Sequence, residues 1–90
     1  MIDWADIRKR FPVTENFAYL NSAAAGPVSR ASFEAASGYY EKMSSDGDVH
    51  WNRWLADREA IRKKIAQFIN AEPEEIAFTT NTSSGMNVIV

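Results

Sequence analysis

The chain has 90 residues and a mass of 10.1 kDa, which suffices for one small domain or for part of a larger one. Ten Lys and Arg against twelve Asp and Glu give a formal net charge of −2 and a pI near 5.3, so charge does not favour nucleic acid or an anionic membrane as a partner. With no cysteine and one histidine, the chain has no disulfides, no thiolate ligands and no multi-histidine metal site of its own.

Neither end of the sequence has the pattern of a targeting or membrane segment. Met1–Arg10 mixes acidic and basic side chains, unlike the apolar run of a secretory signal peptide. The longest uncharged stretch, Ile76–Val90, is rich in Thr, Ser and Asn and too short and polar to span a bilayer. We therefore expect a cytoplasmic location by default, with no membrane partner.

The first third of the chain predicts a short helix followed by extended and loop segments. Asp3 suits the N-cap of a helix over residues 4–10, and residues 13–16 predict a turn. The apolar run Phe17–Leu20 predicts a brief strand or extended segment. Small residues and a final Gly-Pro in Asn21–Pro27 predict a loop.

Two longer helices are predicted next. Ser29 suits the N-cap of a helix over residues 30–43, and Ser44–Asp48 is the clearest break in the chain. Residues 49–71 predict a strongly amphipathic helix, because apolar side chains recur at three- and four-residue spacing. This apolar stripe consists of Trp51, Trp54, Leu55, Ile61, Ile65, Phe68 and Ile69.

The last segment predicts a strand that leads through a polar turn into a helix. After a break at residues 73–75, Ile76–Thr80 predicts a buried strand, Asn81–Gly85 a turn, and residues 86–90 the opening of a helix. One strand cannot make a sheet, so we expect its partners elsewhere. The order of elements therefore favours the N-terminal part of a larger α/β domain.

The polar turn is a candidate anion site. The first N–H groups of a helix have no partners within the helix, and with the helix dipole they attract a phosphate. The hydroxyls of Thr82, Ser83 and Ser84 add possible donors, and Gly85 allows close backbone packing. The structural alternative is a simple capped helix, because Ser and Thr are preferred there in any case. The spacing and lysine of a nucleotide P-loop are absent.

Four motifs resemble class V aminotransferase-like enzymes, a group that includes cysteine desulfurases, selenocysteine lyases and isopenicillin-N-epimerase-like enzymes. Tyr19–Pro27 resembles their Y-L-[DN]-x-A-[AG] start, and Arg58–Ala66 resembles their R-x-x-[IL]-x-x-x-[IL]-[AG] helix. Phe68–Phe78 is similar to their connection from helix to first strand, and Phe78–Asn87 to their F-T-x-[GN]-[AT]-[TS]-x-[AG]-x-N turn. The resemblance covers nearly all of the chain, in the family's order.

The resemblance implies an α/β fold, namely the N-terminal fragment of a fold-type I enzyme that depends on pyridoxal 5′-phosphate (PLP). Residues 1–28 would be an N-terminal arm with the substrate-side loop, and residues 29–90 the start of the large domain. It also implies an amino-acid substrate held as a Schiff base, followed by transamination, epimerisation or desulfuration. The parent protein would be a homodimer.

The resemblance also implies roles for individual residues. Thr82 and Ser83 match the positions that hold the PLP phosphate, and Ala23 and Ala24 match the small-residue loop on the substrate side. The alternative for the alanines is a tight structural loop without a ligand.

The catalytic groups of the family have no counterpart in these residues. The family's Schiff-base lysine and the acid at the pyridine nitrogen lie farther downstream. Lys9, Lys42, Lys63 and Lys64 match neither, and the last two suit a solvated helix face. We assign no catalytic and no metal-binding residue, and we expect the 90 residues alone to be inactive.

Other interpretations stay open at this point. The chain could be a small helical interaction protein, or a phosphate-binding remnant without catalysis. Desulfurase-like members of the family often carry a His-Arg pair before the long helix, whereas this chain has Val49-His50-Trp51. This difference slightly favours the epimerase-like subgroup. His50 could be a base or a helix-start histidine, and Arg58 could bind a carboxylate or pair with a neighbouring acid. Trp51 and Trp54 favour core or interface positions over a binding platform.

Overall fold

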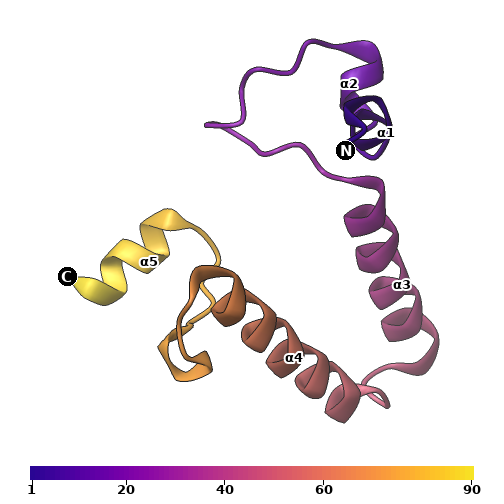
Figure 1. Cartoon of the computed structure of the whole chain (residues 1–90). Helices are drawn as coiled ribbons and strands as arrows, with labels where there is room; N and C mark the ends of the chain where they lie inside the picture. The colour runs from indigo at the N-terminus through magenta and orange to yellow at the C-terminus, as the bar shows by residue number, and fades with distance from the viewer. The chain divides into compact units, whose positions relative to one another are not determined.

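The computed structural model describes all residues, Met1–Val90, and divides them into two compact units, Met1–Asp48 and Val49–Val90. Its elements are helical, and it contains no strand (Figure 1). They are α1 (Trp4–Lys9), α2 (Val13–Asn16), α3 (Arg30–Asp46), α4 (Trp51–Ile69), the 3₁₀ helix η1 (Pro73–Glu75) and α5 (Thr82–Ile89).

The first unit begins with two short helices that are joined by reciprocal bonds. Asp3 caps α1 as predicted, because its Oδ1 accepts from the N–H groups of Ala5 and Asp6 at 3.0 and 3.2 Å. Thr14 Oγ1 donates to the Arg8 carbonyl at 2.9 Å, and Arg8 Nη2 donates to the Thr14 carbonyl at 3.3 Å. The predicted turn at residues 13–16 is thus one turn of helix, held against α1 by its own threonine.

Helix α3 starts where the sequence predicts and ends later. Ser29 Oγ accepts from the N–H of Ser32 at 3.1 Å, which confirms the predicted cap. The helix continues through Asp46, so the predicted break at Ser44–Asp48 is wrong for its first three residues. The stop is at Gly47, whose φ of 63° is a conformation that side-chain-bearing residues rarely adopt.

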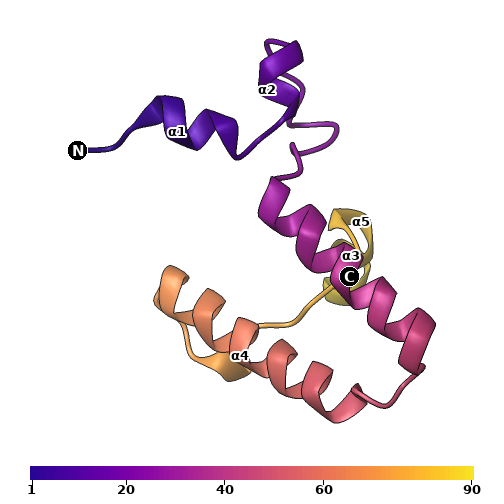
Figure 2. The same cartoon turned by 90° about the vertical axis from the view of Figure 1, so that its right-hand side faces the viewer.

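The second unit begins with α4 and a well-formed helix end. Asn70 takes a left-handed conformation (φ 57°, ψ 47°), and its N–H donates to the Gln67 carbonyl at 3.3 Å. The N–H of Ala71 reaches back to the Ala66 carbonyl at 2.8 Å, which completes a Schellman motif. This turn brings η1 back against α4, as Figures 1 and 2 both show.

Neither of the two segments for which a strand was predicted forms one in this structure. Ile76–Thr80 joins no ladder, although the backbone is extended at Ile76, with φ −101° and ψ 122°. Its burial is also incomplete, since Ile76 is half-buried and Phe78 is 45% exposed. Phe17–Leu20 joins no ladder either, although the backbone is extended at Phe17, with φ −140° and ψ 150°. The physical reason is that a strand's hydrogen bonds come from a neighbouring strand, and neither segment has one.

The polar turn predicted at Asn81–Gly85 is mostly helix. Asn81 is the N-cap of α5, and its Oδ1 accepts from the N–H of Ser84 at 2.8 Å. Helix α5 therefore begins at Thr82, four residues before the predicted opening at Met86. The Ser/Thr run thus forms the first turn of the helix.

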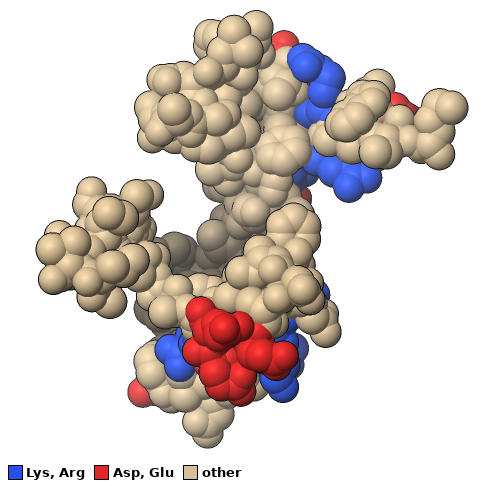
Figure 3. All heavy atoms as spheres, turned by 60° about the vertical axis from the view of Figure 1, so that its left-hand side comes forward, with Lys and Arg blue, Asp and Glu red and all other residues tan.

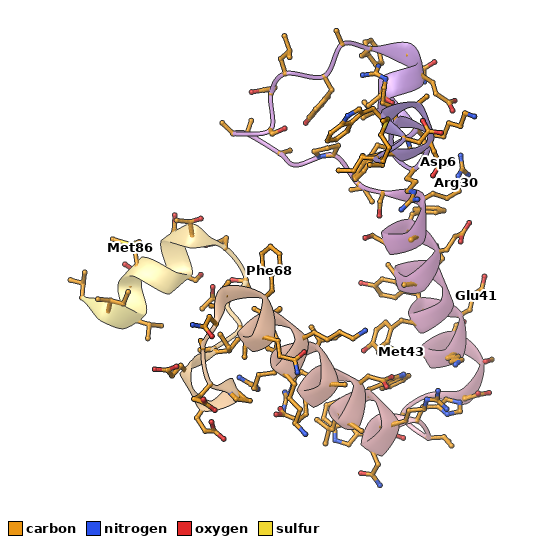
Figure 4. All side chains as sticks on the ribbon, viewed as in Figure 1. Asp6, Arg30, Glu41, Met43, Phe68 and Met86 are labelled. Carbon is orange, nitrogen blue, oxygen red and sulfur yellow. The ribbon has the colours of Figure 1, made fainter.

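Apolar side chains remain uncovered in both units. Ala66, 1% exposed, is the only fully buried residue, and it lies where η1 turns back onto α4. The predicted stripe of α4 exists, yet most of it is open to solvent. Phe68 is 90% exposed and projects away from the helix (Figure 4). Helix α4 thus has an apolar face, but no other part of the chain packs over most of that face.

Charges of both signs lie next to one another on the surface, as Figure 3 shows. Arg10 pairs with Asp6 at 2.8 Å in α1, and Arg62 pairs with Glu59 at 3.1 Å in α4. Asp6 and Arg30 also lie close together in the first unit (Figure 4). None of the helices combines the length and apolar character that crossing a bilayer requires.

Candidate functional site

The loop that contains Ala23 and Ala24 is closed by local hydrogen bonds. The N–H groups of Ala24 and Ala25 donate to the Asn21 carbonyl at 3.1 and 3.2 Å, which confirms the predicted loop. The Tyr19 hydroxyl donates to the Ala25 carbonyl and joins the two ends of the loop. Ala23 and Ala24 are exposed, and their methyl groups leave the space beside the turn open.

The first turn of α5 presents unused hydrogen-bond donors. The N–H of Ser84 is taken by the Asn81 side chain and the N–H of Gly85 by the Asn81 carbonyl. The N–H groups of Thr82 and Ser83 have no protein acceptor, and both side chains are exposed. Two N–H groups and two hydroxyls therefore face solvent at the positive end of a helix dipole.

These donors fit a phosphate group. A phosphate dianion offers several acceptor oxygens and is favoured at a helix N-terminus. The neighbouring hydroxyls of Thr80 and Ser84 bond to each other at 3.2 Å, so they support the turn from inside. Thr82 and Ser83 therefore offer both their N–H groups and their hydroxyls, whereas the N–H of Ser84 is taken by Asn81 and its hydroxyl accepts from Thr80.

Gly85 lies in the first turn of α5, next to the side chain of Thr79. A methyl group on Gly85 would meet Thr79 Oγ1 at 3.4 Å and Thr79 Cγ2 at 3.9 Å. These are ordinary van der Waals distances, so the glycine gives the threonine room without being strictly required. Close packing of α5 on residue 79 agrees with the sequence analysis.

The structure places the two predicted residue pairs in different units. Thr82 and Ser83 lie side by side on α5 in the second unit, whereas Ala23 and Ala24 lie in a loop of the first unit. Their roles as cofactor and substrate contacts stay predictions.

The remaining candidate residues occupy surface positions. Lys63 and Lys64 are exposed, which confirms the solvated-face interpretation. Arg58 Nε lies 3.6 Å from Glu59 Oε1 and both side chains are about half exposed, so the ion-pair alternative holds in this structure. His50 is half-buried at the N-cap of α4, with its ring centroid 6.1 Å from that of Trp54.

The sequence analysis missed Arg62, which links α4 to the segment before the candidate site. Its guanidinium donates to the Ile76 carbonyl and lies over the Phe78 ring, 4.9 Å from the ring centre. The sequence held a signal for this position. Arg62 lies four residues before Ala66 and seven after Leu55, so it shares the more buried face of the helix.

Comparison with known families supports the motif resemblance. The family model for aminotransferase class-V matches residues 18–90 of the chain. The chain therefore belongs to the aminotransferase class-V family, whose enzymes depend in general on PLP. Membership implies the fold-type I architecture, although the residues present here form only helices.

Individual relatives point to the same group. The chain is 36% identical over 88 residues to a probable cysteine desulfurase of Pyrococcus abyssi, covering 93% of this chain and 22% of the relative. It is 36% identical over 94 residues to a cysteine desulfurase of Cronobacter sakazakii, covering 92% and 23%. It is 25% identical over 93 residues to an isopenicillin N epimerase of Streptomyces clavuligerus, covering 97% and 22%. The chain thus spans less than a quarter of each relative. No solved structure matches it.

Proposed function

We propose that this chain is the N-terminal part of a PLP-dependent enzyme that acts on an amino acid, and that these residues alone are inactive. Family membership over residues 18–90 supports the enzyme class. The observation that carries the proposal is the pair of unused N–H groups, with their two hydroxyls, at the start of α5. They lie at the place where the resemblance puts the cofactor phosphate.

In this proposal Thr82 and Ser83 hold the phosphate through backbone N–H groups and hydroxyls. When bound, PLP supplies the electron sink that amino-acid chemistry requires, and the protein supplies binding and orientation. Ala23 and Ala24 are proposed as substrate-side residues, because small side chains leave room for a ligand. We also propose a homodimeric parent, on the resemblance alone.

The names of the relatives suggest which reaction to test first. Identity is 36% to two relatives named as cysteine desulfurases and 25% to the one named as an isopenicillin N epimerase. We therefore propose desulfuration of an amino acid such as cysteine as the first branch and epimerisation as the second. Formation of alanine from L-cysteine by the PLP-loaded natural protein, with sulfide released when a reducing thiol is added, would support the first. Inversion at Cα without loss of sulfur would support the second.

The phosphate site is tested by comparing PLP with pyridoxal, which lacks the phosphate. In the full natural protein, Ser83→Ala should lower the affinity for PLP by about tenfold, since it removes one hydrogen bond to a charged group. The affinity for pyridoxal should stay unchanged. Equilibrium dialysis of both ligands measures the difference.

Ser44→Ala is the control, because Ser44 is an exposed serine of α3 in the other unit and contributes nothing to the candidate site. It should leave the preference for PLP over pyridoxal as it is. Equal affinities of wild type and Ser83→Ala for PLP, with Thr82→Ala also unchanged, would remove the proposed phosphate site.

A further inference from the structure

Arg62 is the most enclosed of the ion-paired arginines. Its side chain is 21% exposed, against 67% for Arg10 and 57% for Arg58. Its Nε lies 3.1 Å from Glu59 Oε2, one turn earlier on α4. Its Nη1 donates to the carbonyl of Ile76, and the plane of the guanidinium covers the ring of Phe78. One side chain thus joins α4 to two residues of the segment that follows η1.

This segment has little else to hold it. The N–H of Ile76 bonds to the Pro73 carbonyl at 3.2 Å, but residues 77–80 have no ladder partner. No helix packs directly against α5, whereas α4 packs against η1. The position of α5 on the second unit therefore depends on residues 76–80, which Figure 2 shows running from η1 to α5.

A continuous set of contacts leads from Arg62 to the candidate site. Arg62 holds Ile76 and Phe78, and the next residue, Thr79, donates to the Asn81 carbonyl at 3.3 Å. Thr80 Oγ1 donates to Ser84 Oγ at 3.2 Å inside the first turn of α5. All of these links lie within one unit, and the last of them join the cap and the first turn of α5, which presents the free N–H groups.

We propose that Arg62 is a positioning residue for the phosphate-binding turn of α5. It acts through the backbone of residues 76–80, because its Nη1 donates to the Ile76 carbonyl while its Nε donates to Glu59. The inference rests on the proposed function, because it assigns Arg62 a role toward the same site. It predicts that Arg62 governs recognition of the phosphate and leaves recognition of the pyridine ring alone.

The test measures the affinities for PLP and pyridoxal in the full natural protein. Arg62→Met keeps an unbranched apolar chain but loses the donors and the charge. It should lower the affinity for PLP by about tenfold, comparable to loss of one charged hydrogen bond, with the affinity for pyridoxal unchanged. The ³¹P signal of bound PLP should broaden or shift. Arg62→Lys, which retains a donor and a cation over Phe78, should restore part of the preference.

Arg58→Met is the matched control. Arg58 lies one turn earlier on α4, contacts the same Glu59 and is 57% exposed, yet it reaches nothing in residues 76–80. Its loss should change neither affinity. A purely structural role for Arg62 would lower the affinities for PLP and pyridoxal together, and that result would overturn the inference.

The outcomes separate this inference from the proposed function. If Ser83→Ala weakens PLP selectively and Arg62→Met does not, the phosphate site stands and the positioning role is wrong. If neither variant changes the preference for PLP over pyridoxal, the phosphate site itself is wrong. Should Arg62→Met be insoluble, Phe78→Leu removes the ring face under the guanidinium, and an unchanged preference for PLP in that variant overturns the inference.

Discussion

Single residues set the ends of the helices and the chemistry of the candidate site. Asp3 and Ser29 cap α1 and α3 through side-chain oxygens, as the sequence predicts, and Asn81 does the same for α5. Asn81 has a second effect, because it occupies the N–H of Ser84 and leaves those of Thr82 and Ser83 free. The cap therefore selects which donors face solvent.

Asn81→Asp separates capping from charge. Aspartate caps a helix as well as asparagine does, so helix content measured by circular dichroism should be unchanged. The added carboxylate lies beside the proposed phosphate, and repulsion should weaken PLP binding by about 1 kcal/mol, or several-fold, at low salt. Pyridoxal affinity should not change.

Asn81→Ala is the control variant, since it costs about 1 kcal/mol of helix stability without adding charge. Equal PLP affinities for wild type and Asn81→Asp would contradict a phosphate at this turn.

At the scale of elements, local chemistry explains the helices and a glycine explains where α3 stops. Serines at positions 44 and 45 do not end the helix, because they tolerate helical backbone when exposed. Gly47 ends it, because its conformation of φ 63° and ψ −130° is open mainly to glycine. The two extended segments show the opposite case, in which a local pattern predicts a strand and no neighbour is present to form it.

Two glycine substitutions in the same helix should have opposite effects. Gly47→Ala forces a side chain into a strained conformation and should destabilise the end of α3 by about 1–3 kcal/mol. Gly38→Ala lies inside α3, where an added Cβ meets nothing within 4 Å, and should stabilise the helix by about 1 kcal/mol. Far-UV circular dichroism on heating compares the two. A gain in helicity from Gly47→Ala would show that the positive φ is not required.

At the scale of the whole chain, the apolar surface is larger than the covered core. One residue, Ala66, is fully buried, while large side chains such as Trp4, Phe33 and Phe68 are 67%, 65% and 90% exposed. Burial of apolar surface is the main favourable contribution to folding, and it must offset the loss of conformational entropy. Because these 90 residues bury so little apolar surface, we do not expect them to fold cooperatively on their own. The helices of the isolated 90 residues should therefore be held mainly by local bonds.

We predict that the isolated 90-residue chain unfolds without a sharp transition. It should bind a hydrophobic dye and show little amide-exchange protection at Phe78, because that residue belongs to no ladder. Addition of PLP should not produce a cooperative transition. A monodisperse monomer with a sharp thermal transition and a protected Phe78 amide would contradict this prediction.

Arg62 shows why part of the candidate site could not be predicted from the sequence. The sequence places Thr82 and Ser83 at a helix start, because capping and Ser/Thr preference act within a few residues. It gives no direct sign that an arginine 14 residues before Ile76 bonds to that carbonyl, since the contact depends on the chain turning back after Asn70. The left-handed conformation of Asn70 and the helix η1 create that return.

The sequence by itself determined the positions of α1 and α4, the start of α3, the caps at Asp3 and Ser29, and the motifs that identify the family. All of these depend on interactions between residues a few positions apart. The tertiary structure decided that Ile76–Thr80 joins no ladder and that Arg62 joins α4 to the segment before α5. Those features depend on which distant groups meet, and only the folded chain brings such groups together.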